Sequence, residues 1–336
     1  MRAYEVRDAR GIDGIELNSA RPRPEPGLGE VLIRVRAASL NYRDLLVAKG
    51  RYGAATKPSV VPLSDGAGEV VAVGGGVASV KPGDRVAGAF FPRWAAGPIS
   101  AEVTKAALGG SVDGMLAEYV VLPETGVVAV PGHLGFEEAA TLPCAAVTAW
   151  NAVVGVGQVH AGQTVLLLGT GGVSMFALQF AKLHGATAIQ TSGSEEKIER
   201  ARALGADHTL NYRSVADWDV EVLKLTGGRG VDLVVEVGGP GTLQRSLRAV
   251  RVGGTVVMIG LVAGTGEVNP MPLVARAIRL QGVYVGSRQD FADMNAAIAA
   301  HTLRPVIGKV FEFDQALDAY RHLAAGAHFG KVVVRL

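Results

Sequence analysis

The most informative segment of the chain reads Val165-Leu-Leu-Leu-Gly-Thr-Gly-Gly-Val-Ser-Met-Phe-Ala-Leu-Gln-Phe-Ala-Lys182. Its four leading apolar residues predict a buried parallel strand, and the helical spacing after the glycines predicts a helix. Glycines let the backbone turn sharply and approach a pyrophosphate, while the helix start offers free N–H groups and the positive end of its dipole. We therefore predict a dinucleotide site at Gly169, Gly171, Gly172 and Val173.

Ser174 stands where the usual G-x-G-x-x-G pattern has its third glycine. A small side chain must therefore fit where the helix packs closely on the strand. We include Ser174 in the predicted cofactor site. The alternative is an ordinary tight turn between a strand and a helix, in a sheet that binds nothing.

The next predicted strand, 185–191, bears on which dinucleotide is bound. An NAD site usually carries an Asp or Glu about 20 residues after the glycines, where it accepts bonds from the ribose 2′-hydroxyl. Here the strand ends in Gln190-Thr-Ser192 without an acid. Residues that could donate to a 2′-phosphate, or close its pocket, favour NADP(H): Ser192, Ser194, Lys197 and Tyr212.

Glu195 and Glu196 offer the alternative, because either could be the acid that binds the ribose. Both are also explained without a ligand, as first-turn residues of a helix that Ser194 caps.

Length and composition favour a two-domain enzyme. The 336 residues are 49% hydrophobic and carry a formal net charge of +2, which argues against a nucleic-acid partner. Cys144 is the only cysteine, so no intramolecular disulfide can form and a reducing compartment is expected. The N-terminus lacks the apolar core of a signal peptide, and no apolar run is long enough to cross a bilayer. We therefore expect a soluble, cytoplasmic protein with no membrane partner.

The pattern of secondary structure changes along the chain. Up to about residue 125, short strands are broken by Pro and Gly, and only 41–49 looks helical. From about residue 135, helices alternate with apolar strands, which predicts an α/β fold with a doubly wound parallel sheet. The later strands are expected at 231–237, 254–260 and 280–286. A final strand, 330–336, is expected to return to the N-terminal domain.

Several motifs resemble the medium-chain dehydrogenase/reductase superfamily from end to end. Besides the β-rich N-terminal part and the glycine turn, they are Lys81-Pro-Gly-Asp-Arg-Val86, Leu142-Pro-Cys-Ala-Ala-Val-Thr-Ala-Trp150 and Ala201-Arg-Ala-Leu-Gly-Ala-Asp207. The resemblance implies a GroES-like β domain, residues 1–125 plus 289–336, and a Rossmann dinucleotide-binding domain, residues 126–288.

Zinc-dependent members of this superfamily carry ligands that are missing here. Their first Cys corresponds to the Asn41-Tyr42 region and their His-Glu pair to Ser64-Asp65, and the four cysteines of a structural zinc site are absent from 90–114. Only Asp65 and Cys144 could join a catalytic set, and two ligands are insufficient. The resemblance therefore implies the zinc-independent quinone oxidoreductase-like branch, with no bound metal.

Without a Lewis acid, hydrogen-bond donors must stabilise the charge that hydride transfer creates. Quinones and α,β-unsaturated carbonyls delocalise that charge, so the sequence favours an NADPH-dependent reductase of these small molecules. One alternative is a zinc-free alcohol dehydrogenase or carbonyl reductase. Another is a non-catalytic NADPH-binding protein, of the crystallin-like or RNA-associated kind found among relatives.

The resemblance also implies roles for residues outside the glycine turn. It places three candidate catalytic residues at the cleft between the domains, namely Asn41, Asp44 and Tyr52, and Arg43 is a second candidate donor beside them. The alternatives are a helix N-cap for Asn41 and a solvated ion pair for Arg43 with Asp44. Further candidates for the cofactor site are Thr148, Leu261, Ser287, Arg288 and Lys331. Of these, Ser287 and Arg288 are expected to end the last parallel strand. Lys331 lies where relatives have a basic residue near the pyrophosphate. Thr148 could instead bond its own helix backbone.

Two surface features complete the expectations. The predicted strand 280–286 would be an apolar edge strand, and relatives pair it across a two-fold axis, so we expect a homodimer. The loop 90–114 carries Phe90, Phe91 and Trp94, which either form an apolar wall for substrate rings or pack under the loop. The sequence does not identify the physiological substrate.

Overall fold

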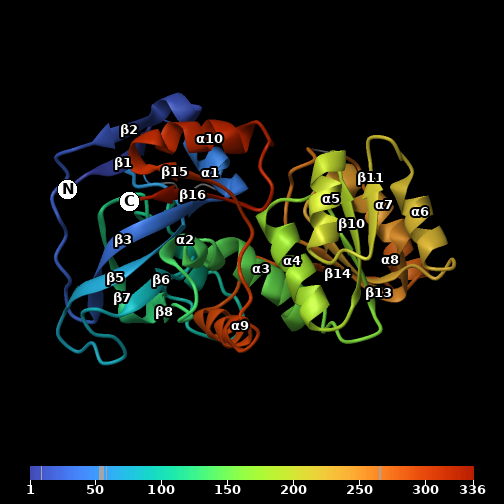
Figure 1. Cartoon of the computed structure of the whole chain (residues 1–336), viewed down its shortest axis with the longest axis horizontal. Coiled ribbons are helices and arrows are strands. Elements are labelled where there is room, and N and C mark those ends of the chain that lie inside the picture. The colour runs from blue at the N-terminus through green and yellow to red at the C-terminus, as the bar shows by residue number, and fades with distance from the viewer. Residues whose placement is uncertain (9, 53–56, 58, 265) are drawn as a thin grey trace. The chain divides into compact units, whose positions relative to one another are not determined.

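The computed structural model describes residues 1–336 except 9, 53–56, 58 and 265. The chain folds as two compact units (Figure 1). The β-rich unit comprises Met1–Val147 and Gly286–Leu336, and the parallel-sheet unit comprises Thr148–Val285. The predicted α/β class is confirmed.

Strands and helices alternate along the parallel-sheet unit. Its elements, after α3 (Val147–Trp150) at the junction, are β9 (Thr164–Leu167), α4 (Gly172–Leu183), β10 (Thr187–Ser192), α5 (Glu195–Ala203), β11 (His208–Asn211), α6 (Trp218–Leu225), β12 (Val231–Glu236), α7 (Pro240–Ala249), β13 (Val250–Met258), α8 (Met271–Ala275) and β14 (Arg279–Gly282). All six strands are parallel, in the order β11-β10-β9-β12-β13-β14.

The strand order is the doubly wound topology that the sequence predicts. The chain starts in the middle of the sheet at β9, runs outward to β11, and then returns to β12 beside β9. Figure 1 shows α4 and α5 on one side of this sheet and α6, α7 and α8 on the other. Because both faces are covered, the central strands are mostly apolar, and Leu166, Val234 and Val256 are fully buried. The point where the order reverses, between β9 and β12, is where such sheets bind ligands.

The β-rich unit contains two sheets and few helices. Its elements are β1 (Ala3–Arg7), β2 (Ile15–Asn18), β3 (Glu30–Leu40), α1 (Tyr42–Ala48), β4 (Ser59–Val60), β5 (Asp65–Val73), β6 (Arg85–Gly88), β7 (Tyr119–Pro123), β8 (Val127–Ala129), α2 (Phe136–Ala139), α9 (Arg288–Ala300), β15 (Ile307–Glu312), α10 (Ala316–Ala324) and β16 (Lys331–Arg335). The larger sheet has the order β15-β16-β3-β5-β6-β8, with β7 also pairing with β3. The smaller sheet has the order β2-β1-β4.

The C-terminal strand pairs with the N-terminal part of the chain, as expected. β16 lies antiparallel to β3, with Val332 opposite Leu40. Its buried residues Val332 and Val334 share one apolar core with Val31 and Ile33 of β3. Burial of these side chains therefore attaches the C-terminal segment to a unit that begins at residue 1.

The observed boundaries differ from the expected ones in two places. The division falls after residues 147 and 285 rather than at 125 and 288. Residues beyond 125 join the β-rich unit because β8 pairs with β6 and α2 packs on β3 and β5. The last parallel strand, expected at 280–286, ends at Gly282. Within the residues that the structure describes, no helix is long and apolar enough to cross a membrane.

Candidate active site

The predicted glycine turn lies directly after β9, next to the point where the strand order reverses. Gly169 has φ +72°, and a Cβ there would meet no atom within 4 Å, so the turn leaves open space over its backbone. Gly171 is the N-cap of α4, whose first turn therefore presents the N–H groups of Gly172, Val173 and Ser174 without partners in earlier turns. This geometry fits a pyrophosphate at the helix start.

Ser174, which stands in place of the third glycine, makes a hydrogen bond to the preceding strand segment. Its hydroxyl donates to the carbonyl oxygen of Leu168 at 2.6 Å, and the side chain is only 2% exposed. The carbonyl that follows β9 is thereby bonded to the first turn of α4. The serine side chain is accommodated between strand and helix, as the sequence requires.

The end of β10 carries polar groups but no acid. Buried Gln190 donates from Nε2 to the carbonyl oxygen of Leu167 at 3.1 Å, and the Thr191 hydroxyl accepts from the Gly169 N–H at 3.2 Å. Ser192 ends the strand and is 2% exposed, and its Oγ accepts from the Ser194 N–H at 3.4 Å. The side chains of β10 thus connect its end to the glycine turn.

Ser194 and Glu195 have structural partners. Ser194 is the N-cap of α5, and its Oγ accepts from the Lys197 N–H at 3.4 Å. Glu195 accepts a hydrogen bond from Asn211, and Glu196 lies 4.0 Å from Arg200 on the same helix. The two acids are therefore paired with neighbouring side chains in this structure.

Positive charge gathers beside the end of β10. Burial lowers the pKa of Lys197, and the nearby charges of Arg200 and Arg213 lower it further, while Glu196 opposes them. The charges of Arg200 and Arg213 therefore act on the Lys197 ammonium. Arg213 was missed by the sequence analysis, although it directly follows Tyr212.

Tyr212 covers the turn between β10 and α5. Its N–H donates to the carbonyl oxygen of Ser192 at 3.0 Å, and a Cβ on Gly193 would lie 2.7 Å from the phenol oxygen. A larger residue at position 193 would therefore require the Tyr212 ring to shift. The side chain is 44% exposed, so one part of it remains available to a ligand.

A buried carboxylate that the sequence analysis missed organises the loop after β12. Glu236 is fully buried, and its Oε1 accepts from the N–H groups of Gly238 and Gly239 and from the Thr242 hydroxyl, at 2.7, 3.0 and 2.6 Å. Its second oxygen accepts from Ser246. Four donors therefore satisfy one carboxylate at the carboxyl end of a central strand.

The two remaining candidates in this unit lie in different environments. Leu261 is 60% exposed and follows β13, where its side chain packs so closely on Gly239 that a Cβ there would lie 2.9 Å from Cδ2. Thr148 lies in α3 and is 3% exposed. Leu261 is thus open to solvent, whereas Thr148 is almost wholly buried.

In the β-rich unit, three strand ends meet at one edge of the larger sheet. β3 ends at Leu40, and its neighbours β16 and β5 begin at Lys331 and Asp65. The antiparallel register places Val332 opposite Leu40 and Ser39 opposite Asp65. Residues far apart in the sequence are thus brought together just before α1.

These strand ends form a closed polar ring of four side chains. Lys331 donates from Nζ to Asn41 Oδ1 at 2.6 Å, and Asn41 Nδ2 lies 3.5 Å from Ser64 Oγ. Ser64 donates to Asp65 Oδ1 at 2.7 Å, and Asp65 Oδ2 lies 3.5 Å from the same ammonium. Lys331 also donates to the carbonyl oxygen of Leu40 at 2.8 Å. Lys331 thus binds within the β-rich unit.

Arg43 and Asp44 are buried, so the alternative of a solvated ion pair is wrong. Arg43 donates to the Leu108 carbonyl oxygen at 2.7 Å, and its guanidinium carbon lies 4.3 Å from the centre of the Tyr52 ring. Asp44 is 1% exposed and accepts from the Asn41 N–H at 2.7 Å. Burial raises the pKa of Asp44 to about 6, against the opposing charge of Arg43.

Asn41 itself is the N-cap of α1. The alternative of a structural cap is therefore compatible with the geometry, yet the capping bonds use the Asn41 backbone N–H and carbonyl oxygen. Its carboxamide also belongs to the polar ring. One residue thus starts the helix and presents a polar side chain.

Ser287 and Arg288 do not end the last parallel strand, which corrects the expectation. β14 has already ended at Gly282, and Ser287 is the N-cap of α9 in the β-rich unit, with its Oγ accepting from the Asp290 N–H at 3.1 Å. Arg288 donates from side-chain Nε to the Val127 carbonyl oxygen at 3.0 Å. Its backbone N–H donates to the Trp94 carbonyl oxygen at 2.9 Å. Ser287 thus caps α9, and Arg288 joins that helix to the rest of the β-rich unit.

The aromatic residues of the 90–114 loop pack beneath it. Phe90, Phe91 and Trp94 are 2%, 1% and 5% exposed. The rings of Phe90 and Phe91 meet edge to face at 4.6 Å, and Arg43 lies 5.0 Å from the Phe90 ring. Of the two readings left open by the sequence, packing under the loop is the one observed.

The residues at the zinc position of the zinc-dependent relatives do not fit a zinc ion. The Asp65 carboxylate already accepts from Ser64 and from the Cys144 N–H, and it faces the Lys331 ammonium, which would repel a second cation. Burial raises the pKa of the Cys144 thiol well above its usual value, which disfavours the thiolate that zinc needs. Among the described residues, no three His, Cys, Asp or Glu side chains are grouped as a metal site would require.

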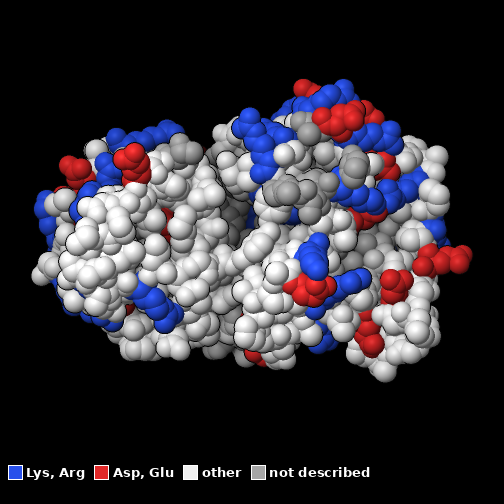
Figure 2. Space-filling view, turned by 180° about the vertical axis from the view of Figure 1, so that it is seen from behind, with Lys and Arg blue, Asp and Glu red and all other residues white. Residues whose placement is uncertain are grey.

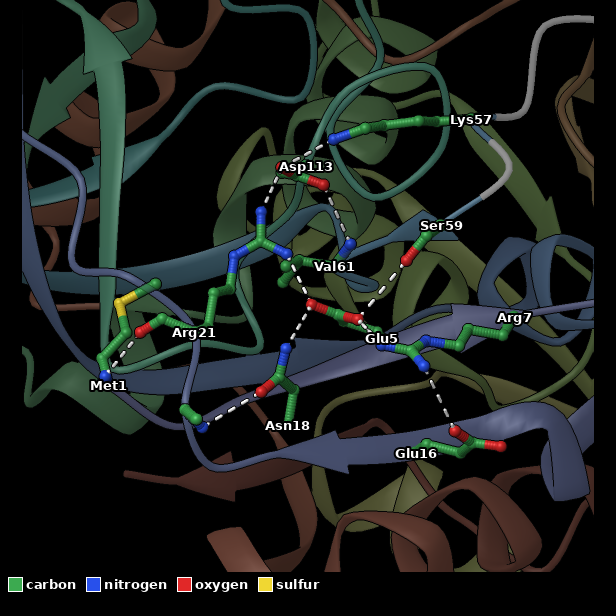
Figure 3. Close-up of polar contacts among 11 residues, drawn as sticks. Met1, Glu5, Arg7, Glu16, Asn18, Arg21, Lys57, Ser59, Val61 and Asp113 are labelled. Carbon is green, nitrogen blue, oxygen red and sulfur yellow. Dashed lines mark hydrogen bonds and ion pairs between the residues drawn. The ribbon is translucent and has the colours of Figure 1, made fainter.

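A second polar cluster in the β-rich unit is internally satisfied. Glu5 accepts from Arg21 at 2.7 Å and from Asn18 at 3.1 Å, while Asp113 accepts from Arg21 at 2.6 Å and from Lys57 at 3.0 Å. Figure 3 shows how these side chains lie together. The cluster borders a cavity of about 680 Å³. Because its charges bind one another, we regard it as structural.

Positively and negatively charged side chains are mixed on the face of the molecule drawn in Figure 2. Figure 2 shows Lys and Arg side chains beside Asp and Glu on the face drawn, in keeping with the net charge of +2. Such a mixed surface differs from the basic stripe typical of proteins that bind nucleic acid.

Comparisons with known proteins agree with this architecture. Residues 27–132 match the family model of the alcohol dehydrogenase GroES-like domain, and residues 172–300 match that of the zinc-binding dehydrogenase. The chain is 46% identical to a zinc-type alcohol dehydrogenase-like protein of Schizosaccharomyces pombe, over 99% of each chain. It is 29% identical to a quinone oxidoreductase of Pongo abelii, over 100% of this chain and 98% of that one.

Solved structures of similar proteins share the whole fold. An NAD-dependent alcohol dehydrogenase has a TM-score of 0.91 at 36% identity, and the match covers 100% of both chains. A mycobacterial protein complexed with NADPH has a TM-score of 0.85 at 27% identity, again over 100% of both.

Proposed function

The chain belongs to the medium-chain dehydrogenase/reductase superfamily, and we propose that it is a zinc-independent, NADPH-dependent oxidoreductase that transfers hydride to quinones or α,β-unsaturated carbonyls. The observation that carries the proposal is the end of β10, which has serine and nearby cations where an NAD-specific site has an acid. The similarity to a mycobacterial protein that binds NADPH and to quinone oxidoreductases supports it.

The parallel-sheet unit offers groups that fit NADP(H). The pyrophosphate would lie over Gly169 and at the first turn of α4, where Val173 and Ser174 offer backbone N–H groups. The 2′-phosphate would be bound by Ser192 and Lys197, with Arg213 as a further cation. The other proposed contacts are Ser194, Tyr212, Leu261 and Thr148.

The β-rich unit would supply the donors for the substrate. When bound, NADPH supplies the hydride, and the substrate oxygen then gains negative charge that must be stabilised. In our proposal the Asn41 carboxamide donates to that oxygen, and the buried pair Arg43–Asp44, with Tyr52 against the guanidinium, fixes the start of α1. Quinones and enones suit such a site because their charge is delocalised, so weak donors suffice.

A second candidate function is the reduction of saturated carbonyls or the oxidation of alcohols without zinc. The specific reason to retain it is the 36% identity to a solved NAD-dependent alcohol dehydrogenase. This function places a localised alkoxide charge in the site, which requires stronger stabilisation than an enolate does.

The experiment that separates these functions follows the nicotinamide absorbance with chelator-treated protein, across quinones, enones, aldehydes and ketones, with NADPH and with NADH. Turnover confined to quinones or enones, with preference for NADPH, supports the proposal. Turnover of aldehydes or alcohols would favour the second candidate. Tight NADPH binding without turnover of any substrate would favour a non-catalytic role, and loss of activity on chelation would contradict zinc independence.

We also propose a homodimer formed through β14. This strand is at the edge of the parallel sheet, so its outer backbone groups are available for pairing. Exposed apolar side chains lie nearby: Leu280, Tyr284, Met271 and Val274. Light scattering at micromolar concentration should give twice the 34.8 kDa of one chain, and a monomer would contradict the proposal.

A further inference from the structure

The polar ring at the end of β3 has bonds of fixed direction. A lysine ammonium has three donors and no acceptor, so the Asn41 oxygen must face Lys331. The Asn41 NH₂ group therefore faces away from the ammonium, toward Ser64. Ser64 donates its only hydroxyl proton to Asp65, so it can only accept from Asn41. The orientation of the carboxamide thus follows from the chemistry of its neighbours.

The Lys331 ammonium has its partners within the β-rich unit. It donates hydrogen bonds to the Leu40 carbonyl oxygen and to Asn41 Oδ1, and it forms an ion pair with the Asp65 carboxylate at 3.5 Å. The side chain is 2% exposed, so in this structure the ammonium is closed off from a phosphate. This geometry disagrees with a role for Lys331 in binding the pyrophosphate.

The ring also holds the positive charge of Lys331 against the side-chain oxygen of Asn41. Lys331 and Asp65 are 2% and 0% exposed, whereas Asn41 is half-buried and is the member that a ligand can reach. An ammonium on the oxygen of a carboxamide polarises the amide and strengthens its N–H groups as donors. Asp65 supplies the counter-charge that a buried ammonium requires.

The backbone before the ring is strained. Leu63 has φ +67°, a conformation that non-glycine residues rarely adopt, and it immediately precedes Ser64 and Asp65. Gly109 and Gly114 approach it so closely that a Cβ on either would meet Leu63 backbone atoms at 2.6 and 2.1 Å. Such strain persists only when the surroundings enforce it, and it is typical of functional sites.

We propose that Lys331 is a positioning residue that acts through Asn41: it fixes the carboxamide so that its second N–H donates to the substrate oxygen that gains charge on hydride transfer. The inference deepens the proposed function and rests on it. Lys331 takes no part in cofactor binding and touches no substrate. Its ammonium polarises the Asn41 carboxamide, whose N–H is the donor to the substrate.

A double-mutant cycle tests this coupling at saturating NADPH. We expect Lys331→Met to lower kcat about 10- to 100-fold while the Kd for NADPH changes less than about threefold, since removal of one such donor typically costs 10²–10³ in kcat. Asn41→Ala should lower kcat by a similar factor. In the Asn41→Ala background, Lys331→Met should change kcat less than about twofold, because the two residues act as one unit.

Matched variants guard against a loss of folding. Lys309→Met removes an exposed lysine from the neighbouring strand β15 and should leave kcat unchanged. Lys331→Met combined with Asp65→Asn removes both buried charges and should show the same loss of kcat with a normal circular dichroism spectrum. Lys331→Arg, which keeps a donor to Asn41, should restore part of the activity.

Two results would overturn the proposal. One is a large rise in the Kd for NADPH with unchanged kcat, which would assign Lys331 to the cofactor. The other is additive effects of the Lys331 and Asn41 variants. If the wild-type protein reduces neither quinones nor enones, the proposed function fails, and the ring is then tested by NMR. Lys331→Met should shift the side-chain amide signals of Asn41 and speed their exchange, and unchanged signals would refute the role of Lys331.

Discussion

The Ser174 hydroxyl donates a hydrogen bond to the carbonyl oxygen of Leu168 at 2.6 Å, at the position of the third glycine in the G-x-G-x-x-G pattern. The bond connects Leu168, the residue directly after β9, with the first turn of α4. A departure from the usual glycine pattern is thereby turned into a direct link between the strand and the helix that flank the proposed pyrophosphate site.

We predict that Ser174→Ala destabilises the fold by about 1–2 kcal/mol, because it leaves a buried carbonyl oxygen without its donor. The Kd for NADPH should change less than twofold, since in our proposal the phosphate contacts come from backbone N–H groups. Urea unfolding and calorimetric titration measure the two quantities. Ser19→Ala, at an exposed turn, is the matched control. A fully stable variant would mean that water replaces the serine donor.

Lys197→Met and Arg213→Met should each weaken NADPH binding about 10- to 100-fold, because each removes a charge-assisted contact worth about 1.5–3 kcal/mol. The Kd for NADH should be nearly unchanged, since NADH lacks the 2′-phosphate. Lys224→Met, on the exposed face of α6, controls for the loss of one positive charge. Equal weakening of both cofactors would place these cations elsewhere than at the 2′-phosphate.

Glu236→Gln should destabilise the protein by about 2–4 kcal/mol. Glu236 now accepts hydrogen bonds from four donors. A glutamine side chain has only one acceptor oxygen, and its NH₂ group would face at least one of these donors. Turnover should also fall, since the loop that Glu236 organises contacts Leu261 through Gly239. Unfolding experiments and steady-state kinetics check the two effects, and unchanged stability would show that the loop can rearrange at little cost.

Local sequence patterns predicted the parts of this protein that depend on local chemistry. The glycine turn, the strand that ends without an acid and the doubly wound order all follow from short segments and their spacing. The Ser194 cap was likewise predicted from its position before two acids. In these cases the residues that decide the structure are close together in the chain.

Long-range pairing explains what the sequence did not predict. Lys331 meets Asn41 and Asp65 only because β16 and β5 flank β3 in one register, and no local pattern encodes that register. The four donors of Glu236 depend on the path of the loop after β12 and on α7, and the only sequence signal was an acid at the end of a mostly apolar strand that also contains Asp232. The early end of β14 moved Ser287 and Arg288 from the parallel sheet to the start of α9.

Glu5 lies at the centre of the polar cluster in Figure 3. Burial opposes its ionisation, yet hydrogen bonds from Arg7, Asn18 and Arg21 lower its pKa from 4.5 to about 2. The folded state therefore holds the ionised carboxylate more strongly than the unfolded chain does. The same carboxylate joins β1 to the segment around Arg21, so its charge state bears on the stability of the smaller sheet.

From this shift we predict how stability depends on pH. Because the pKa is lower in the folded state, the stabilisation is fully present above about pH 4.5 and is lost as the pH falls toward about 2. Its size is about 2–3 kcal/mol, since each unit of pKa shift is worth about 1.4 kcal/mol and the arginine partners are partly exposed to solvent. Glu5→Gln should remove that amount at pH 7 and flatten the decline between pH 4.5 and 3, as measured by urea unfolding at each pH. Glu16→Gln, an exposed neighbour on β2, is the matched control and should leave the profile nearly unchanged. A profile for Glu5→Gln that parallels the wild type would show that other carboxylates cause the acid destabilisation.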